Sequence, residues 1–333
     1  MKTPMLTCLR LLALSSIICM LGCRHQNDRL GDLDGVSTLP IKHTPSTAFS
    51  ELAWSPDGQF VAARAYAGQN NSTVTIIDLQ TGQSQRLYES GKDSFHGPEW
   101  SPDGQYLVFH IPSSLVSPLG GGPIEVVPPY NIVVVDTDTG QITRDLGFGS
   151  YATWTAYLER VIVLGQSQGS CGTKIPINEY SLTNGTTRTI GYTGTCWPEA
   201  VDSLDVSAGG KLVVPNIDGT NNQIMDIADG ISQGTLNPMR GSTVWSPDGT
   251  MLAFIVKKME SGVSTDSIIL AGPDGACLSD PLELNSYLYS VDWSPDGSRL
   301  VFSNRDVNRL YFLDLTTGVG KELMDSYQAN CGN

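Results

Sequence analysis

The sequence predicts an all-β chain in which six similar units of four antiparallel strands close into a ring. Three observations predict this fold: a five-residue motif that recurs at a constant spacing, a second turn motif that follows it, and a composition suited to short strands. The 333 residues include 35 glycines and 19 prolines, and only 16% of them are charged. Short strands joined by turns that contain glycine and proline are typical of all-β proteins.

The recurring motif is Trp-Ser-Pro-Asp-Gly, and it begins at Trp54, Trp100, Trp245 and Trp293. The first two copies are 46 residues apart and the last two are 48 apart, while the gap of 145 residues between the middle copies leaves room for two more. Degenerate copies lie there, at Trp154-Thr155 and at 206–210. Proline presets φ in the turn, aspartate accepts local hydrogen bonds, and glycine takes the positive φ that ends it. The motif therefore predicts a hairpin turn between the first two strands of each unit.

A second turn, Asp-Leu-Gln-Thr-Gly at 78–82, has counterparts at 136–140, 181–185, 226–230, 273–275 and 314–318. It predicts the connection between the third and fourth strands. Six repeats of about 48 residues with four strands each are typical of a six-bladed β-propeller, whose closure removes exposed sheet edges. We assign residues 39–326 to the propeller and expect residues 39–42 to supply the outer strand of blade six.

The Trp-Ser-Pro-Asp-Gly turns resemble those of the TolB-like six-bladed β-propellers, and the resemblance covers nearly all of the mature chain. It implies the same fold and, because such propellers are often seen with an ion in the channel, a cation site on the axis. The chain is not TolB itself, because only about twenty residues separate Cys23 from the first blade. That distance is too short for the separate N-terminal domain of that protein.

The N-terminus predicts export. Residues 1–22 carry two basic residues and an apolar stretch from Leu11 to Leu21, which is typical of a signal peptide and too short for a membrane span. Met20-Leu21-Gly22-Cys23 resembles a lipobox, so we expect a lipidated Cys23, a tether over 23–38 and a short tail over 327–333. The protein would be lipid-anchored in the bacterial cell envelope, either in the outer membrane facing the periplasm or at the cell surface. An ordinary signal peptide that leaves Cys23 as a thiol is the alternative.

Charge and cysteines narrow the possible partners and compartments. Removal of residues 1–22 lowers the net charge from −14 to −16, which argues against nucleic acid as a partner. Four further cysteines in an oxidising compartment predict two disulfides. The pairing we favour is Cys171 with Cys196 and Cys277 with Cys331, although the other pairings remain open.

Two candidate sites follow from the repeat. The position before the tryptophan is acidic in blades two, four and six, where Glu99, Asp205 and Asp292 can converge on the channel axis as an oxygen site for a hard cation such as Ca²⁺. Alternatively, each acid accepts a hydrogen bond from a neighbouring strand or faces channel water. The second candidate is the long loop of blade two, whose apolar residues form either a partner patch or a cap on their own blade. These residues are Leu115, Val116, Leu119 and Ile124.

The sequence favours a monomeric, non-catalytic module that binds an envelope protein or a cell-wall polymer, because no complete set of catalytic residues is recognisable. One alternative is a lyase or hydrolase that acts on a saccharide with a metal at the channel or loop face; His96 and His110 are fragments of such a site. Another is a ligand sensor with a pocket at the channel mouth, near Glu51, Tyr151 and Trp197.

Overall fold

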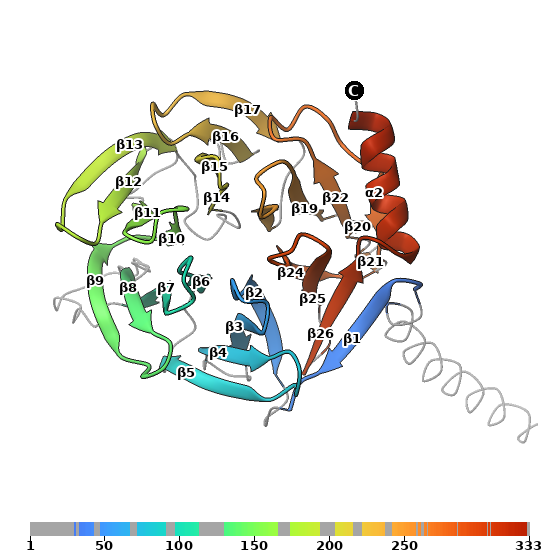
Figure 1. The fold of residues 1–333 in the computed structure, drawn as a ribbon, viewed down its shortest axis with the longest axis horizontal. Coiled ribbons are helices and arrows are strands. Elements are labelled where there is room, and N and C mark those ends of the chain that lie inside the picture. The colour runs from blue at the N-terminus through green and yellow to red at the C-terminus, as the bar shows by residue number, and fades with distance from the viewer. Residues whose placement is uncertain are drawn as a thin grey trace, which may run out of the picture.

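The strands form six four-stranded antiparallel sheets in the described part of the chain, and these sheets are arranged as blades around a central axis (Figure 1). The computed structural model describes residues 30, 33–42, 47–66, 72–90, 97–112, 130–165, 174–193, 204–215, 222–236, 242–257, 259–260, 263–264, 266–284, 286–304, 306 and 308–331. The predicted six-bladed propeller is confirmed.

The blades follow one another along the chain, each running from the axis outward. Blade one holds β2 (Ala48–Trp54), β3 (Phe60–Tyr66), β4 (Ser72–Asp78) and β5 (Ser84–Ser90). Blade two holds β6 (Glu99–Trp100), β7 (Tyr106–Pro112), β8 (Tyr130–Asp136) and β9 (Ile142–Phe148). Blade three holds β10 (Tyr151–Trp154), β11 (Arg160–Leu164), β12 (Ile175–Ser181) and β13 (Thr187–Thr193).

The second half of the ring has the same order. Blade four holds β14 (Asp205–Val206), β15 (Lys211–Pro215), β16 (Asn222–Asp226) and β17 (Ser232–Leu236). Blade five holds β18 (Thr243–Trp245), β19 (Leu252–Val256), β22 (Ser267–Ala271) and β23 (Leu282–Glu283), with a small hairpin of β20 (Met259–Glu260) and β21 (Val263–Ser264). Blade six holds β24 (Leu288–Trp293), β25 (Arg299–Asn304), β26 (Arg309–Asp314) and β1 (Val36–Pro40).

The recurring turn is stabilised by local hydrogen bonds. Ser55 donates from Oγ to Asp57 Oδ1 at 2.6 Å and accepts at Oγ from the main-chain N–H of Phe60 at 2.9 Å. The same pair of bonds recurs at Ser101, Ser246 and Ser294. In the degenerate blades Thr155 and Ser207 take over the role of the serine.

The N-terminal segment closes the ring. Strand β1 pairs antiparallel with β26, and Figure 1 shows the two lying side by side although they come from opposite ends of the chain. The outer strand of blade six is therefore residues 36–40, three residues earlier than the expected start at Leu39, so the predicted tether ends before Val36. Lys42 then bridges to Gln83 of blade one, which joins the closing segment to the first blade.

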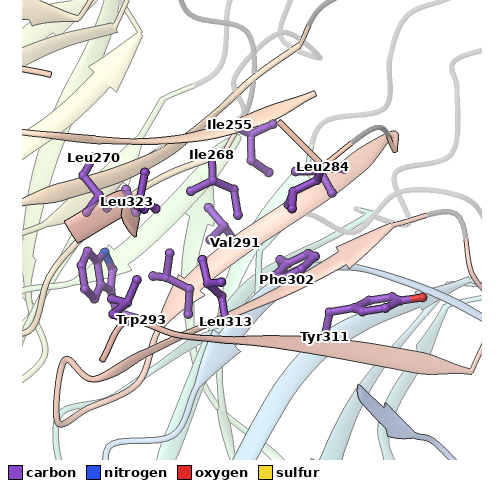
Figure 2. Close-up of a cluster of buried hydrophobic side chains, with 14 of the residues drawn as sticks. Ile255, Ile268, Leu270, Leu284, Val291, Trp293, Phe302, Tyr311, Leu313 and Leu323 are labelled. Atoms are coloured by element: carbon purple, nitrogen blue, oxygen red, sulfur yellow. The ribbon is translucent and has the colours of Figure 1, made fainter. Parts of the chain in front are cut away.

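The hydrophobic core lies between the blades. Six clusters of buried side chains occur among the described residues, each at the junction of two adjacent blades. Figure 2 shows the cluster between blades five and six, where Ile268 and Leu270 face Val291, Trp293 and Phe302. Four tryptophans that end innermost strands are about 95% buried in such junctions, so their role is structural. They are Trp54, Trp154, Trp245 and Trp293.

A C-terminal helix, α2 (Gly318–Cys331), was not expected from the sequence and includes the predicted boundary at residue 326. Its Leu323 and Tyr327 belong to the core between blades five and six. Asn330 Nδ2 donates to the carbonyl of Leu278, and Cys277 forms a disulfide with Cys331. The helix covers the outer edge of blade five, where β23 is only two residues long.

Cys277 lies between β22 and β23, so it precedes the outer strand of blade five. The other cysteines of the predicted framework, Cys23, Cys171 and Cys196, lie outside the described residues. Among the helices that the structure describes, none has the length and apolar character needed to span a membrane.

Candidate functional site

A cavity of about 380 Å³ lies at one mouth of the central channel. Side chains from all six blades line it, mostly from the start of each innermost strand. The opposite ends of these strands carry the Trp-Ser-Pro-Asp-Gly turns, so the cavity and the turns lie on opposite faces of the ring. The charged and aromatic residues of the described lining are Phe49, Glu51, Arg64, Tyr66, Glu99, Tyr151, Asp205, Lys257 and Tyr289.

Two β-bulges shape this mouth. In blade one the pairing of β2 with β3 jumps from Ser50–Arg64 to Ala53–Ala62, which gives β2 one extra residue. In blade six the pairing of β24 with β25 jumps in the same way around Tyr289. Bulges re-aim side chains and are frequent beside functional sites. Here they occur in adjacent blades, and both add a residue to the cavity lining.

The bulge in blade one holds Glu51 in a left-handed conformation, with φ of 52°. Its carboxylate accepts a hydrogen bond from the main-chain N–H of Gly97 at 2.7 Å and forms an ion pair with Arg64 at 3.3 Å. Left-handed backbone costs a residue with a β-carbon about 1–3 kcal/mol, and it persists where surrounding contacts fix it. The side chain of Glu51 supplies those contacts and joins blade one to blade two.

Two of the three predicted channel acids bridge neighbouring blades. An innermost strand has a partner on one side only, so some of its N–H groups need another acceptor. Asp205 Oδ2 accepts from the main-chain N–H of Trp245 at 2.7 Å, and Asp292 Oδ2 accepts from that of Trp54 at 2.6 Å. Burial raises the pKa of Asp205 to about 6 and that of Asp292 to about 7. This is the alternative in which each acid caps a neighbouring strand.

Glu99 differs from the two aspartates. Its side chain lines the cavity, and no hydrogen bond to its carboxylate is present among the described residues. Burial, followed by the nearby charges of Asp205 and Asp292, raises its pKa well above the ordinary value. The main chain of Glu99 is fixed because its carbonyl accepts from the indole Nε1 of Trp154 at 3.1 Å. Glu99 therefore has a fixed main chain and a carboxyl that has no hydrogen-bond donor within the described part of the chain.

The three acids influence one another electrostatically, but their arrangement does not suit direct coordination of a cation. No group of three His, Cys, Asp or Glu side chains in the described part of the chain is placed to hold a metal ion. Asp205 and Asp292 each direct an oxygen at a main-chain N–H instead. A Ca²⁺ site formed by Glu99, Asp205 and Asp292 is thus not supported by the donor geometry.

Some of the remaining candidate residues from the sequence lie in the described part of the chain, and others lie outside it. Glu51 and Tyr151 line the channel mouth, as the ligand-sensor alternative required. His110 is buried, its Nδ1 lies 2.6 Å from the carbonyl of Ser150, and its ring stacks on Tyr130, so it supports blade packing. Outside the described residues lie His96, Trp197 and the loop residues Leu115, Val116, Leu119 and Ile124.

Arg64, Lys257 and Tyr289 line the cavity but were not predicted from the sequence. Arg64 lies in β3, two residues before its end, and Lys257 follows the end of β19; the repeat gives no reason to single them out. Tyr289 enters the lining through a bulge that nothing in the local sequence marks. One signal was available in the sequence. The residue three positions before the tryptophan is charged in blade one only, where it is Glu51.

The fold and the channel define this chain as a six-bladed β-propeller with a polar cavity on its axis. No protein-family model matches the chain, and no curated protein sequence matches it. Three similar solved structures are at most 18% identical to this chain and support the fold alone. TolB from Acinetobacter baumannii is 18% identical with a TM-score of 0.51, over 82% of this chain and 55% of that one, so this chain spans about half its length.

Two other structures have comparable similarity. Hydrazine synthase from Kuenenia stuttgartiensis is 18% identical with a TM-score of 0.54, over 86% of this chain and 85% of that one. The β-propeller domain of Cps50 (Swd1) from Myceliophteria thermophila is 12% identical with a TM-score of 0.51, over 83% of this chain and 98% of that domain. Such different proteins share the fold, so function has to be argued from the site.

Proposed function

We propose that this chain is a non-catalytic, lipid-anchored binding protein of the bacterial cell envelope, and that it holds its ligand at the channel mouth. The observation that carries the proposal is the cavity itself, to which all six blades contribute. Its volume of about 380 Å³ falls in the range of small-molecule sites, and it is wide enough to admit a side chain of a partner protein.

The architecture of the cavity supports a ligand-binding role for its lining residues. The two bulges add Glu51 and Tyr289 to one mouth of the channel, and the strained backbone of Glu51 is retained there. Strained residues cluster at binding and active sites. The rigid ring also fixes the lining side chains before a ligand arrives, which lowers the entropic cost of binding.

The envelope location rests on two features. The signal-like segment ends at Gly22-Cys23, and the Cys277–Cys331 disulfide suits an oxidising compartment. Incorporation of labelled palmitate tests the anchor: wild-type protein should retain the label after denaturing extraction, and Cys23→Ala should lose it. Equal labelling of both proteins would remove the anchor from the proposal.

A saccharide hydrolase or lyase is the second candidate, favoured by the raised pKa of Glu99. A carboxyl with a raised pKa is a suitable general acid, and glycosidases pair such an acid with a second carboxylate. Asp205 would be the neighbour in that role, although its oxygens already accept main-chain hydrogen bonds. Turnover of cell-wall saccharides that is abolished by Glu99→Gln would favour the enzyme over the binding module.

Site-specific photo-crosslinking in cells tests the binding module. A photoreactive phenylalanine analogue replaces Tyr66, which is 40% exposed and lines the cavity. The matched control replaces Tyr157, which is 70% exposed and lies in the turn that follows β10, on the opposite face. We expect a discrete adduct from position 66 and none from position 157. Equal capture at both positions would show that the channel mouth is not the binding surface.

A further inference from the structure

The charged side chains that line the cavity differ in whether they already have ionic or hydrogen-bond partners. Among the described residues, three carboxylates and two basic side chains line it. Glu51 and Arg64 form an ion pair, and Glu51 also accepts from the main chain of Gly97. These two residues therefore satisfy each other and leave no free charge for a ligand.

The other basic residue is also engaged. The ammonium of Lys257 lies 5.4 Å from the ring centroid of Tyr287, in a cation–π contact. Among the described residues, the cavity thus offers an anionic ligand no cation that is not already in use. The other charged residues of the described lining are Asp205 and Glu99, and both of these are acidic.

Asp205 and Glu99 differ in what they can still accept. Asp205 has a main-chain N–H bound at each oxygen, from Trp245 and from Val206. Glu99 has no such donor among the described residues. A half-buried carboxylate without a donor is costly, and it is the strongest unused acceptor at this mouth of the channel.

The aromatic lining favours an organic cation over a metal ion. Tyr151 and Tyr289 line the same cavity, and the faces of aromatic rings attract ammonium groups. The volume of about 380 Å³ exceeds the needs of a single ion, and the described carboxylates are not grouped as metal ligands. The ligand should therefore combine a positive charge, hydrogen-bond donors and an organic body.

We propose that the channel-mouth cavity binds a protonated primary amine, with Glu99 as the acceptor of its ammonium group and Tyr151 and Tyr289 beside its organic body. The inference rests on the proposed binding function and adds the ligand class. The amine belongs either to a free small molecule or to a lysine side chain of a partner, because both present the same ammonium group to Glu99.

Calorimetric titration of the mature chain, purified in detergent, tests this inference with matched probes. Tyramine and cadaverine carry primary ammonium groups, while 4-ethylphenol and 1,5-pentanediol are their uncharged counterparts. We expect at least one amine to bind about tenfold more tightly than its counterpart. Equal affinity for an amine and its counterpart, or no binding of either amine, would overturn the inference.

Three variants link the affinity to one side chain. Glu99→Gln removes the charge and should weaken amine binding about tenfold or more, while Glu99→Asp keeps the charge and should retain part of the affinity. Glu322→Gln removes one charge from the exposed face of α2 and should leave binding unchanged. Each variant is first shown to have the thermal midpoint of its parent to within a few degrees. Wild-type affinity in Glu99→Gln would exclude Glu99 as the acceptor.

The crosslinking at position 66 separates the two proposals and the two sources of amine. An adduct at position 66 together with equal binding of charged and uncharged probes would leave the binding module intact and reject the amine. No adduct at position 66, together with no preference for the amine probes over their uncharged counterparts, would reject both proposals. If a captured protein partner is displaced by cadaverine, the amine belongs to that partner; an adduct of low mass identifies a free ligand.

Discussion

The carboxylate of Asp292 accepts a hydrogen bond from the main-chain N–H of Trp54 across 238 residues of sequence, at an oxygen–nitrogen distance of 2.6 Å. This bond joins the innermost strand of the last blade to that of the first, at the junction where the ring closes. On the outer side of the same junction, β1 pairs with β26. The closure is therefore fastened at both its inner and its outer edge.

Asp292→Ala should destabilise the ring closure. The N–H of Trp54 would lose its acceptor in a buried position, which costs about 1–3 kcal/mol of the free energy of unfolding. Asp292→Asn keeps an acceptor oxygen in the same place and should cost less. Chemical denaturation of the two variants beside wild type measures the difference. If the alanine and asparagine variants unfold at the same denaturant concentration, the bond has no role in stability.

The buried channel acids should make the protein more stable at mildly acidic pH than at alkaline pH. The folded state raises the pKa of Asp205 to about 6 and that of Asp292 to about 7, from ordinary values of 3.8. The folded state therefore binds these protons more tightly than the unfolded state, and the resulting stability is complete below about pH 4 and lost as pH rises to about 7.

At low pH, stability is limited by turn aspartates whose pKa is lowered in the folded state, in contrast to the raised pKa values of the channel acids. The hydroxyl of Ser294 is the largest cause that lowers the pKa of Asp296 to about 2, so its contribution is present above pH 3.8 and lost below that value. The free energy of unfolding should thus be greatest near pH 4 and should fall as the pH rises to about 7. Denaturation between pH 4 and pH 7 tests the expectation against a Glu99→Gln, Asp205→Asn, Asp292→Asn variant, whose fall in stability over this range should be smaller.

The blades could be predicted from the sequence because their turns are stabilised locally. The hydrogen bonds among Ser55, Asp57 and Phe60 lie within six residues, so the motif alone is enough to predict the turn. The degenerate third and fourth blades were placed correctly because Thr155 and Ser207 keep a hydroxyl where the motif has serine. The position of the acids before the tryptophans, on the channel side of the innermost strands, agrees with the two-residue period of a strand.

The features that could not be predicted from the sequence depend on contacts between residues that are far apart along the chain. The conformation of Glu51 is fixed by Gly97 and Arg64, and a glutamate carries no local signal for positive φ as glycine or asparagine would. The donor that satisfies Asp292 is a main-chain group, which no pattern of side chains reveals. Helix α2 is weakly amphipathic and takes its position from the core of blades five and six and from Cys277.

Loss of the Cys277–Cys331 disulfide should loosen α2 without opening the ring. The bond closes a segment of 54 residues, and removal of such a bond costs about 2–4 kcal/mol in the chain-entropy model. Hydrogen exchange of a Cys277→Ser, Cys331→Ser variant should increase in α2 and at the edge of blade five. Amide exchange in β2 and β3 serves as the internal control. Uniformly faster exchange in all blades would mean that the helix supports the whole ring.

The strain at Glu51 can be separated from the contacts of its side chain. Glu51→Ala and Glu51→Gly both remove the ion pair with Arg64, but only glycine adopts φ of 52° without a steric penalty. We expect Glu51→Gly to be more stable than Glu51→Ala by about 1 kcal/mol, in the opposite order to that of an ordinary strand position. Ser50, the preceding residue of β2, is the matched control, and there the alanine variant should be the more stable. If alanine is the more stable variant at both positions, the bulge at Glu51 relaxes in solution, and the channel mouth then has a different lining from the one that the proposed binding site requires.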